Sequence, residues 1–268
     1  MNDMSEDELW PFFAQLADAA AAQTLPRFRR SQAVDNKSTG GDFDPVTEAD
    51  RETELALRAV ISARFPDHGI SGEEGLDVIG TSPWTWIIDP IDGTRSFVSG
   101  MPTWGTLIGV LHDGSPRYGM MSQPFVGESF IGGGGTALHL RGDARDPMGC
   151  ADTTLLKAAT LFSTTPDMFA AGAEKAAFDA LSARVQLTRF GADCYGYVLL
   201  AAGYIDLVVE ANLGYYDIAP LIPIIESAGG VVSDWRGQPV RSGGQAIAAA
   251  TPALLEAALG ELSRGASA

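Results

Sequence analysis

Trp86-Ile87-Ile88-Asp89-Pro90-Ile91-Asp92-Gly93-Thr94 is the most informative pattern in this chain of 268 residues. Its apolar half predicts a buried strand, which ends in two carboxylates three positions apart and a turn containing proline and glycine. Two carboxylates this close repel each other unless a cation lies between them. Carboxylate and backbone carbonyl oxygens are the ligands of hard divalent cations such as magnesium. The alternative is a turn in which the aspartates accept hydrogen bonds from backbone N–H groups. We favour the metal site, because an unpaired acid at the end of an apolar strand is costly.

The composition is that of a globular protein, with 46% hydrophobic and 19% charged residues. Its 34 acids and 18 bases give a formal net charge of −16, which argues against binding to nucleic acid or to an anionic membrane. Two cysteines, Cys150 and Cys194, are too few for a disulfide framework. The acidic N-terminus lacks the pattern of a signal peptide, and the best apolar run, 198–209, is interrupted by Asp206. We therefore expect a cytoplasmic protein.

The hydrophobic pattern divides the chain into two halves, 1–145 and 146–268, which we expect to pack tightly as one unit. The first half predicts two amphipathic helices joined by a loop over 33–45, then a mainly antiparallel sheet. We expect Ser5 and Glu8 to form a capping box at the first helix. The second half alternates strands and helices, which predicts an α/β layer. Pro223 predicts a kink, or a different start, in the helix assigned from Asp217. The predicted helices are 6–25, 47–65, 167–183, 191–202, one from 217 and 252–262; the predicted strands are 69–72, 84–89, 106–111, 117–123, 129–131, 136–140, 159–163, 185–188, 205–210, 230–234 and 246–250.

Three other acidic segments have plain structural interpretations when each is taken alone. Ser71-Gly72-Glu73-Glu74 follows a short strand and reads as a charged surface turn. The segment from Asp44 to Asp50 reads as a loop with a helix cap, and Asp217 reads as a residue at a helix start. A helix start also offers free N–H groups to phosphate oxygens, and the turn Gly93-Thr94 could serve in that way.

Together these segments resemble the inositol monophosphatase family from about Asp18 to about Leu262. The matching positions are Lys37, Asp44-Pro-Val-Thr-x-Ala-Asp50, Gly72-Glu73-Glu74, Asp89-Pro-Ile-Asp92-Gly-Thr94 with Phe97, and Asp217 preceding Glu226-Ser-Ala-Gly-Gly230. The resemblance implies a metal-dependent, lithium-sensitive phosphomonoesterase and a homodimer. The fold it implies is the layered αβαβα sugar-phosphatase fold, of the α+β and α/β classes.

The resemblance also implies a role for each matching residue. Glu73, Asp89 and the carbonyl of Ile91 would hold one magnesium ion, and Asp89, Asp92 and Asp217 a second; a third, weaker ion would lie near Glu73. Thr94 and Asp50 would orient the attacking water, with Glu73 also in the catalytic set. The N–H groups of Gly93 and Thr94 would bind phosphate oxygens, and Lys37 would lie near phosphate and metals. Phosphoryl transfer needs mainly charge neutralisation and positioning, and a pair of metal ions supplies both.

The second half most resembles the histidinol-phosphatase branch of this family. The resemblance is carried by Arg189-Phe-Gly-Ala-Asp193, by the stretch that follows as far as Glu210, and by Tyr216-Asp217. Inositol-type members usually have a small residue or serine at the position of Asp193, and Trp-Asp at that of Tyr216-Asp217. A carboxylate at Asp193 beside Glu210 suits a substrate that carries an ammonium group and an imidazole, although Asp193 could instead cap a helix. We expect Arg189, Asp193 and Glu210 to contact the substrate; the seven-residue spacing from Glu210 to Asp217 matches the family's substrate-contacting acid.

The sequence therefore predicts a magnesium-dependent phosphomonoesterase of a small phosphorylated metabolite, with L-histidinol phosphate as its substrate. The close alternative is an inositol-1-phosphate or broad-specificity sugar phosphatase with the same metals. A non-catalytic metal-binding relative ranks lower, because the predicted ligand set is complete. A phosphoadenosine nucleotidase would need purine contacts that the sequence does not show. Neither cysteine begins a Cys-x5-Arg loop, and Gly132 to Gly135 predicts a hairpin turn rather than a phosphate loop.

Overall fold

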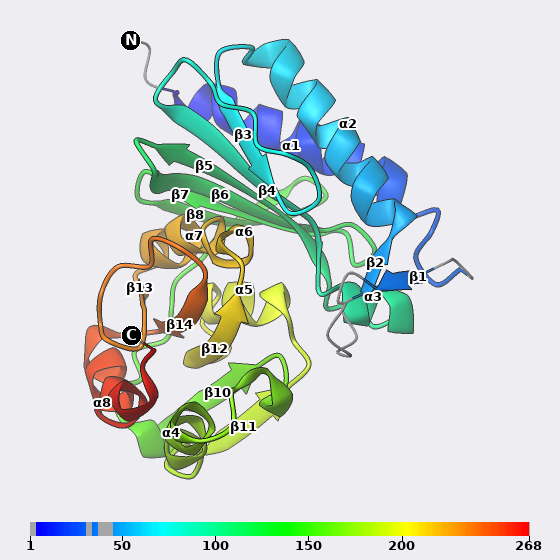
Figure 1. Cartoon of the computed structure of the whole chain (residues 1–268). Coiled ribbons are helices and arrows are strands. Elements are labelled where there is room, and N and C mark those ends of the chain that lie inside the picture. Colours follow the sequence, from blue (N-terminus) through cyan, green and yellow to red (C-terminus); the bar gives the residue numbers. More distant parts are fainter. Residues whose placement is uncertain (1–3, 31–33, 37–44, 268) are drawn as a thin grey trace.

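Two large β-sheets alternate with three layers of helices in a computed structural model that describes residues 4–30, 34–36 and 45–267 (Figure 1). Lys37 and Asp44 lie outside the described residues. The outer helices α1 and α2 cover one face of the first sheet, and α5, α6 and α7 lie between the sheets. Helices α4 and α8 cover the far face of the second sheet (Figure 1). The predicted αβαβα fold is confirmed.

The first sheet has seven strands in the order β3-β4-β5-β6-β7-β8-β9. The pair β3–β4 is parallel and every later pair is antiparallel. A short antiparallel pair, β1 and β2, precedes it within the described residues. The elements of this half are α1 (Glu6–Thr24), β1 (Val34–Asn36), β2 (Pro45–Thr47), α2 (Glu48–Arg64), β3 (Gly69–Gly72), β4 (Trp84–Asp92), α3 (Thr94–Ser99), β5 (Gly105–His112), β6 (Ser115–Gln123), β7 (Glu128–Gly133), β8 (Thr136–Arg141) and β9 (Ala144–Pro147).

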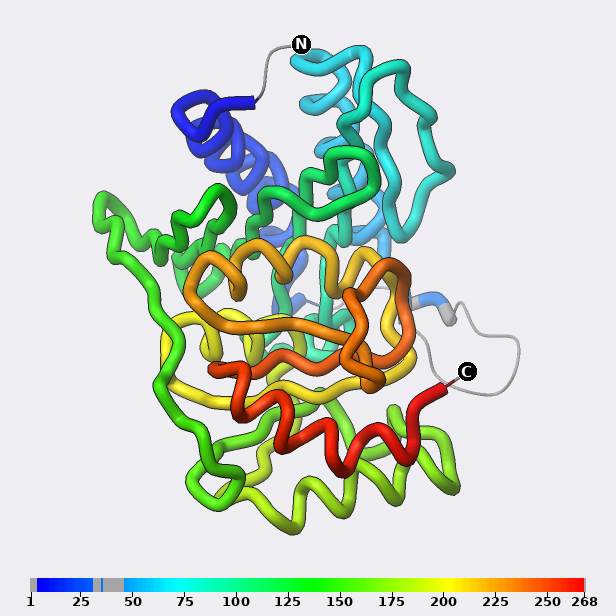
Figure 2. Tube along the Cα trace, turned by 90° about the vertical axis from the view of Figure 1, so that its left-hand side faces the viewer, coloured from blue at the N-terminus to red at the C-terminus, as the bar shows by residue number. Residues whose placement is uncertain are grey.

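The second sheet has five strands in the order β11-β10-β12-β14-β13. Strand β10 runs parallel to both neighbours, whereas β14 is antiparallel to β12 and β13. Figure 2 shows α8, in red, beside α4, with which it is in contact. The elements of this half are β10 (Thr160–Ser163), α4 (Ala173–Ser182), β11 (Leu187–Phe190), α5 (Cys194–Ala201), β12 (Leu207–Leu213), α6 (Tyr215–Ile218), α7 (Leu221–Ser227), β13 (Val231–Ser233), β14 (Gly244–Ala249) and α8 (Pro252–Leu262).

Strand alternation distributes the apolar side chains of each sheet between the cores on its two faces. On β4, Trp86 and Ile88 face the core under α1 and α2, and Ile87 faces α6 and its neighbours. On β12, Val208 faces the helices between the sheets, while Leu207 and Val209 face α4 and α8. Because β4 is buried on both faces, its end is held rigidly inside the molecule.

Several local predictions need correction. Ser5 is the N-cap residue of α1, but its side chain makes no capping hydrogen bond, and Glu8 instead pairs with Arg64 at 3.7 Å. Helix α4 begins at Ala173 rather than 167, because Gly172, with a φ of 107°, separates it from a short 3-10 helix at Pro166–Met168. Strands β1, β2 and β9 were not predicted, and β11 lies two residues beyond its predicted start.

Pro223 is explained by a break between two short helices. Helix α6 ends at Ile218 and α7 begins at Leu221, so Pro223 lies in the first turn of α7. A residue of the first turn has no intrahelical acceptor for its N–H, so proline costs little there.

Along the chain, the first sheet ends at Pro147 and the second begins at Thr160, while the predicted division between the two halves at 145/146 remains a prediction. No described helix combines the length and the apolar character that crossing a bilayer requires.

Candidate active site

The end of β4 positions Asp89 and Asp92. The pairing of β4 with β5 is regular as far as Asp89 and resumes at Asp92 after an irregularity. Within it, the Asp89 carboxylate accepts a hydrogen bond of 3.0 Å from the N–H of Ile91. Thr106 donates its hydroxyl to the carbonyl of Pro90 at 2.8 Å. The strand therefore ends in a fixed bulge, which turns both acids toward one place.

Asp217, at the start of α6, joins these two acids in a cluster. One carboxylate oxygen from each of Asp89, Asp92 and Asp217 lies within 4.8 Å of the others. The N–H of Gly214 binds the Asp217 carboxylate at 2.7 Å. The N–H of Cys194, the first residue of α5, binds Asp92 at 2.7 Å. Both acids are thus held by helix-start N–H groups, which favour negative charge.

The electrostatics of the cluster fit a divalent cation. Burial raises the pKa of Asp89 well above its ordinary value, and the charges of Glu73, Asp92 and Asp217 raise it further. Burial and then the charge of Asp217 raise the pKa of Asp92 in the same direction. A cation between these oxygens would remove the repulsion, and an all-oxygen donor set is the one that magnesium prefers. The residues present therefore fit a magnesium site.

Glu73 and Ile91 lie beside this cluster. Both line the same cavity of about 210 Å³ as the three aspartates. The Glu73 carboxylate is not among the three that meet within 4.8 Å. Burial is the main cause of the raised pKa of Asp89 and of Asp50, and the charge of Glu73 raises both further. The Ile91 side chain is buried, and its carbonyl lies 3.1 Å from the Thr94 hydroxyl. The structure brings every predicted metal ligand to one cavity.

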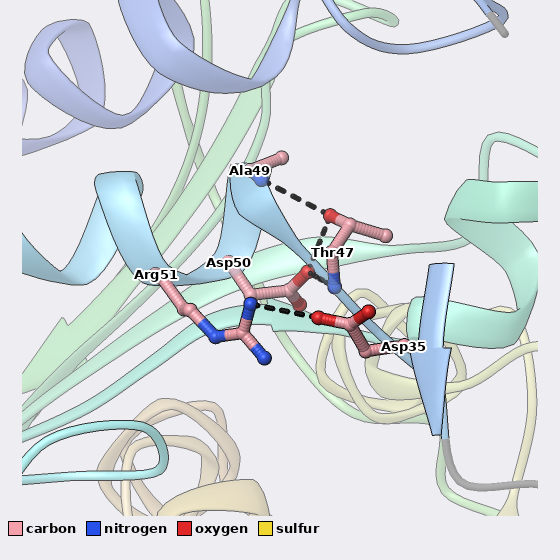
Figure 3. Close-up of polar contacts among 5 residues, drawn as sticks. All are labelled: Asp35, Thr47, Ala49, Asp50 and Arg51. Atoms are coloured by element: carbon pink, nitrogen blue, oxygen red, sulfur yellow. Dashed lines mark hydrogen bonds and ion pairs between the residues drawn. The ribbon is translucent and has the colours of Figure 1, made fainter. Parts of the chain in front are cut away.

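Thr94 connects this cavity to the start of α2. Its hydroxyl lies 3.1 Å from the Ile91 carbonyl and 3.4 Å from the Asp50 carboxylate, either of which can accept its proton. The second oxygen of Asp50 accepts the N–H and hydroxyl of Thr47 at 2.8 and 2.6 Å (Figure 3). This is the capping box of α2, so the predicted cap at Thr47 is present. Gly93 has a φ of 78°, a conformation that few other residues adopt, and lines the cavity.

Asp193 and Glu210 reach the same cavity from the second half of the chain. The Asp193 carboxylate accepts hydrogen bonds from Ser96 at 2.5 Å and Thr103 at 3.0 Å. It occupies the N-cap position of α5 but makes no capping hydrogen bond with its side chain. The interpretation of Asp193 as only a helix cap is therefore not supported.

Glu210 is a buried acid on β12, with 3% of its surface exposed. One of its oxygens accepts the N–H of Thr164 at 2.9 Å and the other accepts the Tyr197 hydroxyl at 2.9 Å. Burial raises its pKa from 4.5 to about 7, although both hydrogen bonds lower it. Neither Thr164 nor Tyr197 was predicted, because each meets Glu210 only through the tertiary fold.

Arg189 is exposed on the edge strand β11 and is not among the residues that line the cavity. A larger cavity, of about 710 Å³, lies near Trp84, His112 and Glu226 and contains none of the predicted site residues. The predicted metal ligands and both predicted substrate-contacting acids therefore line the smaller cavity. Lys37 lies outside the described residues.

Comparison with known proteins shows likeness over nearly the whole chain. A profile of the inositol monophosphatase family matches residues 5–266. The bifunctional phosphatase IMPL2 of Arabidopsis thaliana is 39% identical over 242 residues, covering 88% of this chain and 68% of that protein. A histidinol-phosphatase of Chlorobaculum parvum is 35% identical, with 90% and 91% coverage. The structure of an inositol monophosphatase from Zymomonas mobilis superposes with a TM-score of 0.85 at 36% identity, covering 97% of this chain and all of that one. The chain therefore belongs to the inositol monophosphatase family, a family of metal-dependent phosphatases.

Proposed function

We propose that the protein is a magnesium-dependent phosphomonoesterase that hydrolyses L-histidinol phosphate to L-histidinol and phosphate. The observation that carries this proposal is the position of two buried acids, Asp193 and Glu210, in the same cavity as the aspartate cluster. The likeness to a histidinol-phosphatase over 90% of the chain supports the same substrate.

The phosphate half of the reaction belongs to the cluster. Asp89, Asp92, Asp217, Glu73 and the Ile91 carbonyl would hold two to three magnesium ions. Magnesium, when bound, neutralises phosphate charge and lowers the pKa of water. The Thr94 hydroxyl, whose position Asp50 and the Ile91 carbonyl set, would orient the attacking water. The N–H groups of Gly93 and Thr94, together with Lys37, would bind phosphate oxygens, because N–H groups at a turn of this kind attract anions.

The alcohol half of the substrate belongs to Asp193 and Glu210. L-histidinol carries an ammonium group and an imidazole, both of which gain from carboxylates in a water-poor cavity. Inositol is a neutral polyol and gains less from two negative charges. The predicted contact from Arg189 has no support in the single chain, because that side chain is exposed on β11. We also propose that the protein acts in the cytoplasm and that it is a homodimer. Size-exclusion chromatography with light scattering would test the oligomeric state.

The direct test compares phosphate release from L-histidinol phosphate, inositol 1-phosphate and a sugar phosphate, each in magnesium. We expect kcat/KM for histidinol phosphate to be higher by at least about tenfold, because a charge-assisted hydrogen bond contributes about 1.5–3 kcal/mol. A preference for inositol 1-phosphate would overturn the substrate assignment and leave the phosphatase assignment intact. Release from none of the three would reject both.

The raised pKa of Glu210 predicts a pH dependence of substrate binding. Below about pH 7 this carboxyl is protonated and no longer attracts an ammonium group. We expect KM for histidinol phosphate to rise several-fold as the pH falls from about 8 to about 6, with KM for inositol 1-phosphate less affected. Initial rates over that range measure this dependence. In Glu210→Gln, the matched control, the dependence should be weaker, while Asp193 and the substrate phosphate still titrate; equal profiles in both proteins would contradict the role of Glu210.

The same raised pKa also affects stability: a rise in pH, which should favour substrate binding, lowers the contribution of Glu210 to the stability of the folded state. The folded protein holds the Glu210 proton up to about pH 7, whereas the unfolded chain releases it near 4.5. Between these values the folded state binds more protons, so this group's contribution to stability falls as the pH rises. Glu210→Gln should show a smaller fall than the wild type when urea unfolding is measured across the range, because other buried acids contribute in the same direction.

A further inference from the structure

A buried ion pair on α2 lies behind the turn that carries Glu73. We propose that Glu54 is a positioning residue that fixes this turn, and thereby the Glu73 carboxylate, with Arg58 balancing its charge. This inference rests on the proposed role of Glu73 in the metal site. No motif in the sequence indicated it, because Glu54 looks like one more polar residue of an amphipathic helix.

The contacts of Glu54 go to the two residues that follow Glu73. Its Oε2 accepts the N–H of Glu74 at 2.7 Å, and its Oε1 accepts the N–H of Gly75 at 2.8 Å. The N–H of Glu73 itself binds the carbonyl of Ile88, on β4, at 3.2 Å. The turn is therefore held from one side by the strand that carries Asp89 and from the other by Glu54. These bonds hold the backbone on either side of Glu73 against β4 and α2.

The glycines of the turn are explained by the same contact. A Cβ atom added to Gly72 would lie 2.4 Å from Glu54 Oε1, and one added to Gly75 would lie 2.7 Å from it. Neither glycine has a positive φ, so backbone conformation does not require glycine at these positions. Glycine provides space, because the Glu54 carboxylate lies directly against the backbone of the turn and would have to shift to admit a Cβ atom at either position.

The charge of Glu54 is balanced inside the protein. Only 2% of its side chain is exposed, and 14% of that of Arg58, which donates to Glu54 Oε1 at 2.7 Å from the next turn of α2. A buried carboxylate needs partners for both oxygens. Arg58 satisfies part of this need, and the two N–H groups of the turn satisfy the rest. The turn cannot move without leaving a buried carboxylate oxygen unpaired, and this makes Glu54 a rigid support.

The test replaces Glu54 and measures the metal and the turn without relying on turnover. In Glu54→Gln one side-chain oxygen becomes an NH₂ group, which cannot accept either N–H; Glu54→Ala removes both acceptors. We expect faster hydrogen–deuterium exchange at the amides of Glu74 and Gly75. We also expect magnesium affinity, measured by isothermal titration calorimetry, to fall about tenfold or more, as for other groups that orient a metal ligand. Turnover at saturating magnesium should recover more fully in Glu54→Gln than in Glu54→Ala.

The control is Glu52→Gln on the same helix, which loses an ion pair with Arg27 away from the turn. It should leave magnesium affinity and the exchange of the turn amides unchanged. Unchanged magnesium affinity in both Glu54 variants, below their melting temperatures, would reduce Glu54 to a stabilising residue and overturn the proposal. Because calorimetry needs no substrate, this outcome is separate from failure of the histidinol phosphate assignment; wild-type protein that binds no magnesium would reject the metal site itself.

Discussion

Asp92→Asn is expected to lower kcat for phosphate release by at least about a hundredfold, because metal-assisted charge stabilisation contributes several kcal/mol to the transition state. Asp92 is one of three acids whose oxygens meet within 4.8 Å. The substitution removes its charge at nearly constant shape. The measurement is steady-state kinetics with histidinol phosphate at several magnesium concentrations.

The fold should survive this substitution. The asparagine side-chain oxygen can still accept the N–H of Cys194, which binds the Asp92 carboxylate at 2.7 Å in the wild type. Relief of the repulsion from Asp217 should even favour the metal-free protein. A matched control is Asp113→Asn, at an exposed hairpin position, which should leave kcat unchanged. Full turnover with an unchanged magnesium requirement in Asp92→Asn would overturn the metal assignment.

Removal of divalent metal is expected to have an effect of similar size. Phosphate release should fall at least about a hundredfold after treatment with a chelator and return when magnesium is added. Without the cation, the negative charges of the acids repel the phosphate group of the substrate. Thermal unfolding gives a second measure that does not depend on turnover. A ligand at a hundred times its dissociation constant stabilises the folded state by about 2.7 kcal/mol, so magnesium should raise the melting temperature.

Potassium chloride at matched ionic strength is the control for this experiment, since it screens charge without occupying the cluster. It should restore neither activity nor the melting temperature. Asp92→Asn should gain less thermal stability from magnesium than the wild type does. Undiminished activity in the chelated protein would reject a metal-dependent mechanism.

The parts of the fold that the sequence predicted well are those whose signals are local. Thr47 and Asp50 lie three residues apart and form the capping box of α2. The apolar run before Asp89 forms β4, and the segment from Pro252 forms α8 with the predicted bounds. The start of α4 and the strand β9 were predicted wrongly or missed, for local reasons that residue propensities do not include. Gly172 separates α4 from the turn before it, and β9 pairs through backbone groups that carry no apolar pattern.

The sequence could point to Asp89 and Asp92 as candidate metal ligands because one strand and turn places both acids within four residues. The third acid of the cluster, Asp217, required the family resemblance, and only the tertiary structure shows the three meeting within 4.8 Å. Arg189 shows the limit of such reasoning. It lies four residues before Asp193, which lines the cavity, yet β11 leaves Arg189 exposed at the edge of its sheet.

By itself, the sequence determined the strand–turn that ends in Asp92, the family, and the set of acids that can hold a metal, because hydrophobic period and motif spacing are properties of neighbouring residues. Only the tertiary structure decided how those acids are held. Glu54 supports the Glu73 turn from 20 residues away, and Glu210 binds the Thr164 N–H across 46 residues. Such contacts depend on how two sheets and their helices pack, and a buried carboxylate acquires its partners only when that packing is complete.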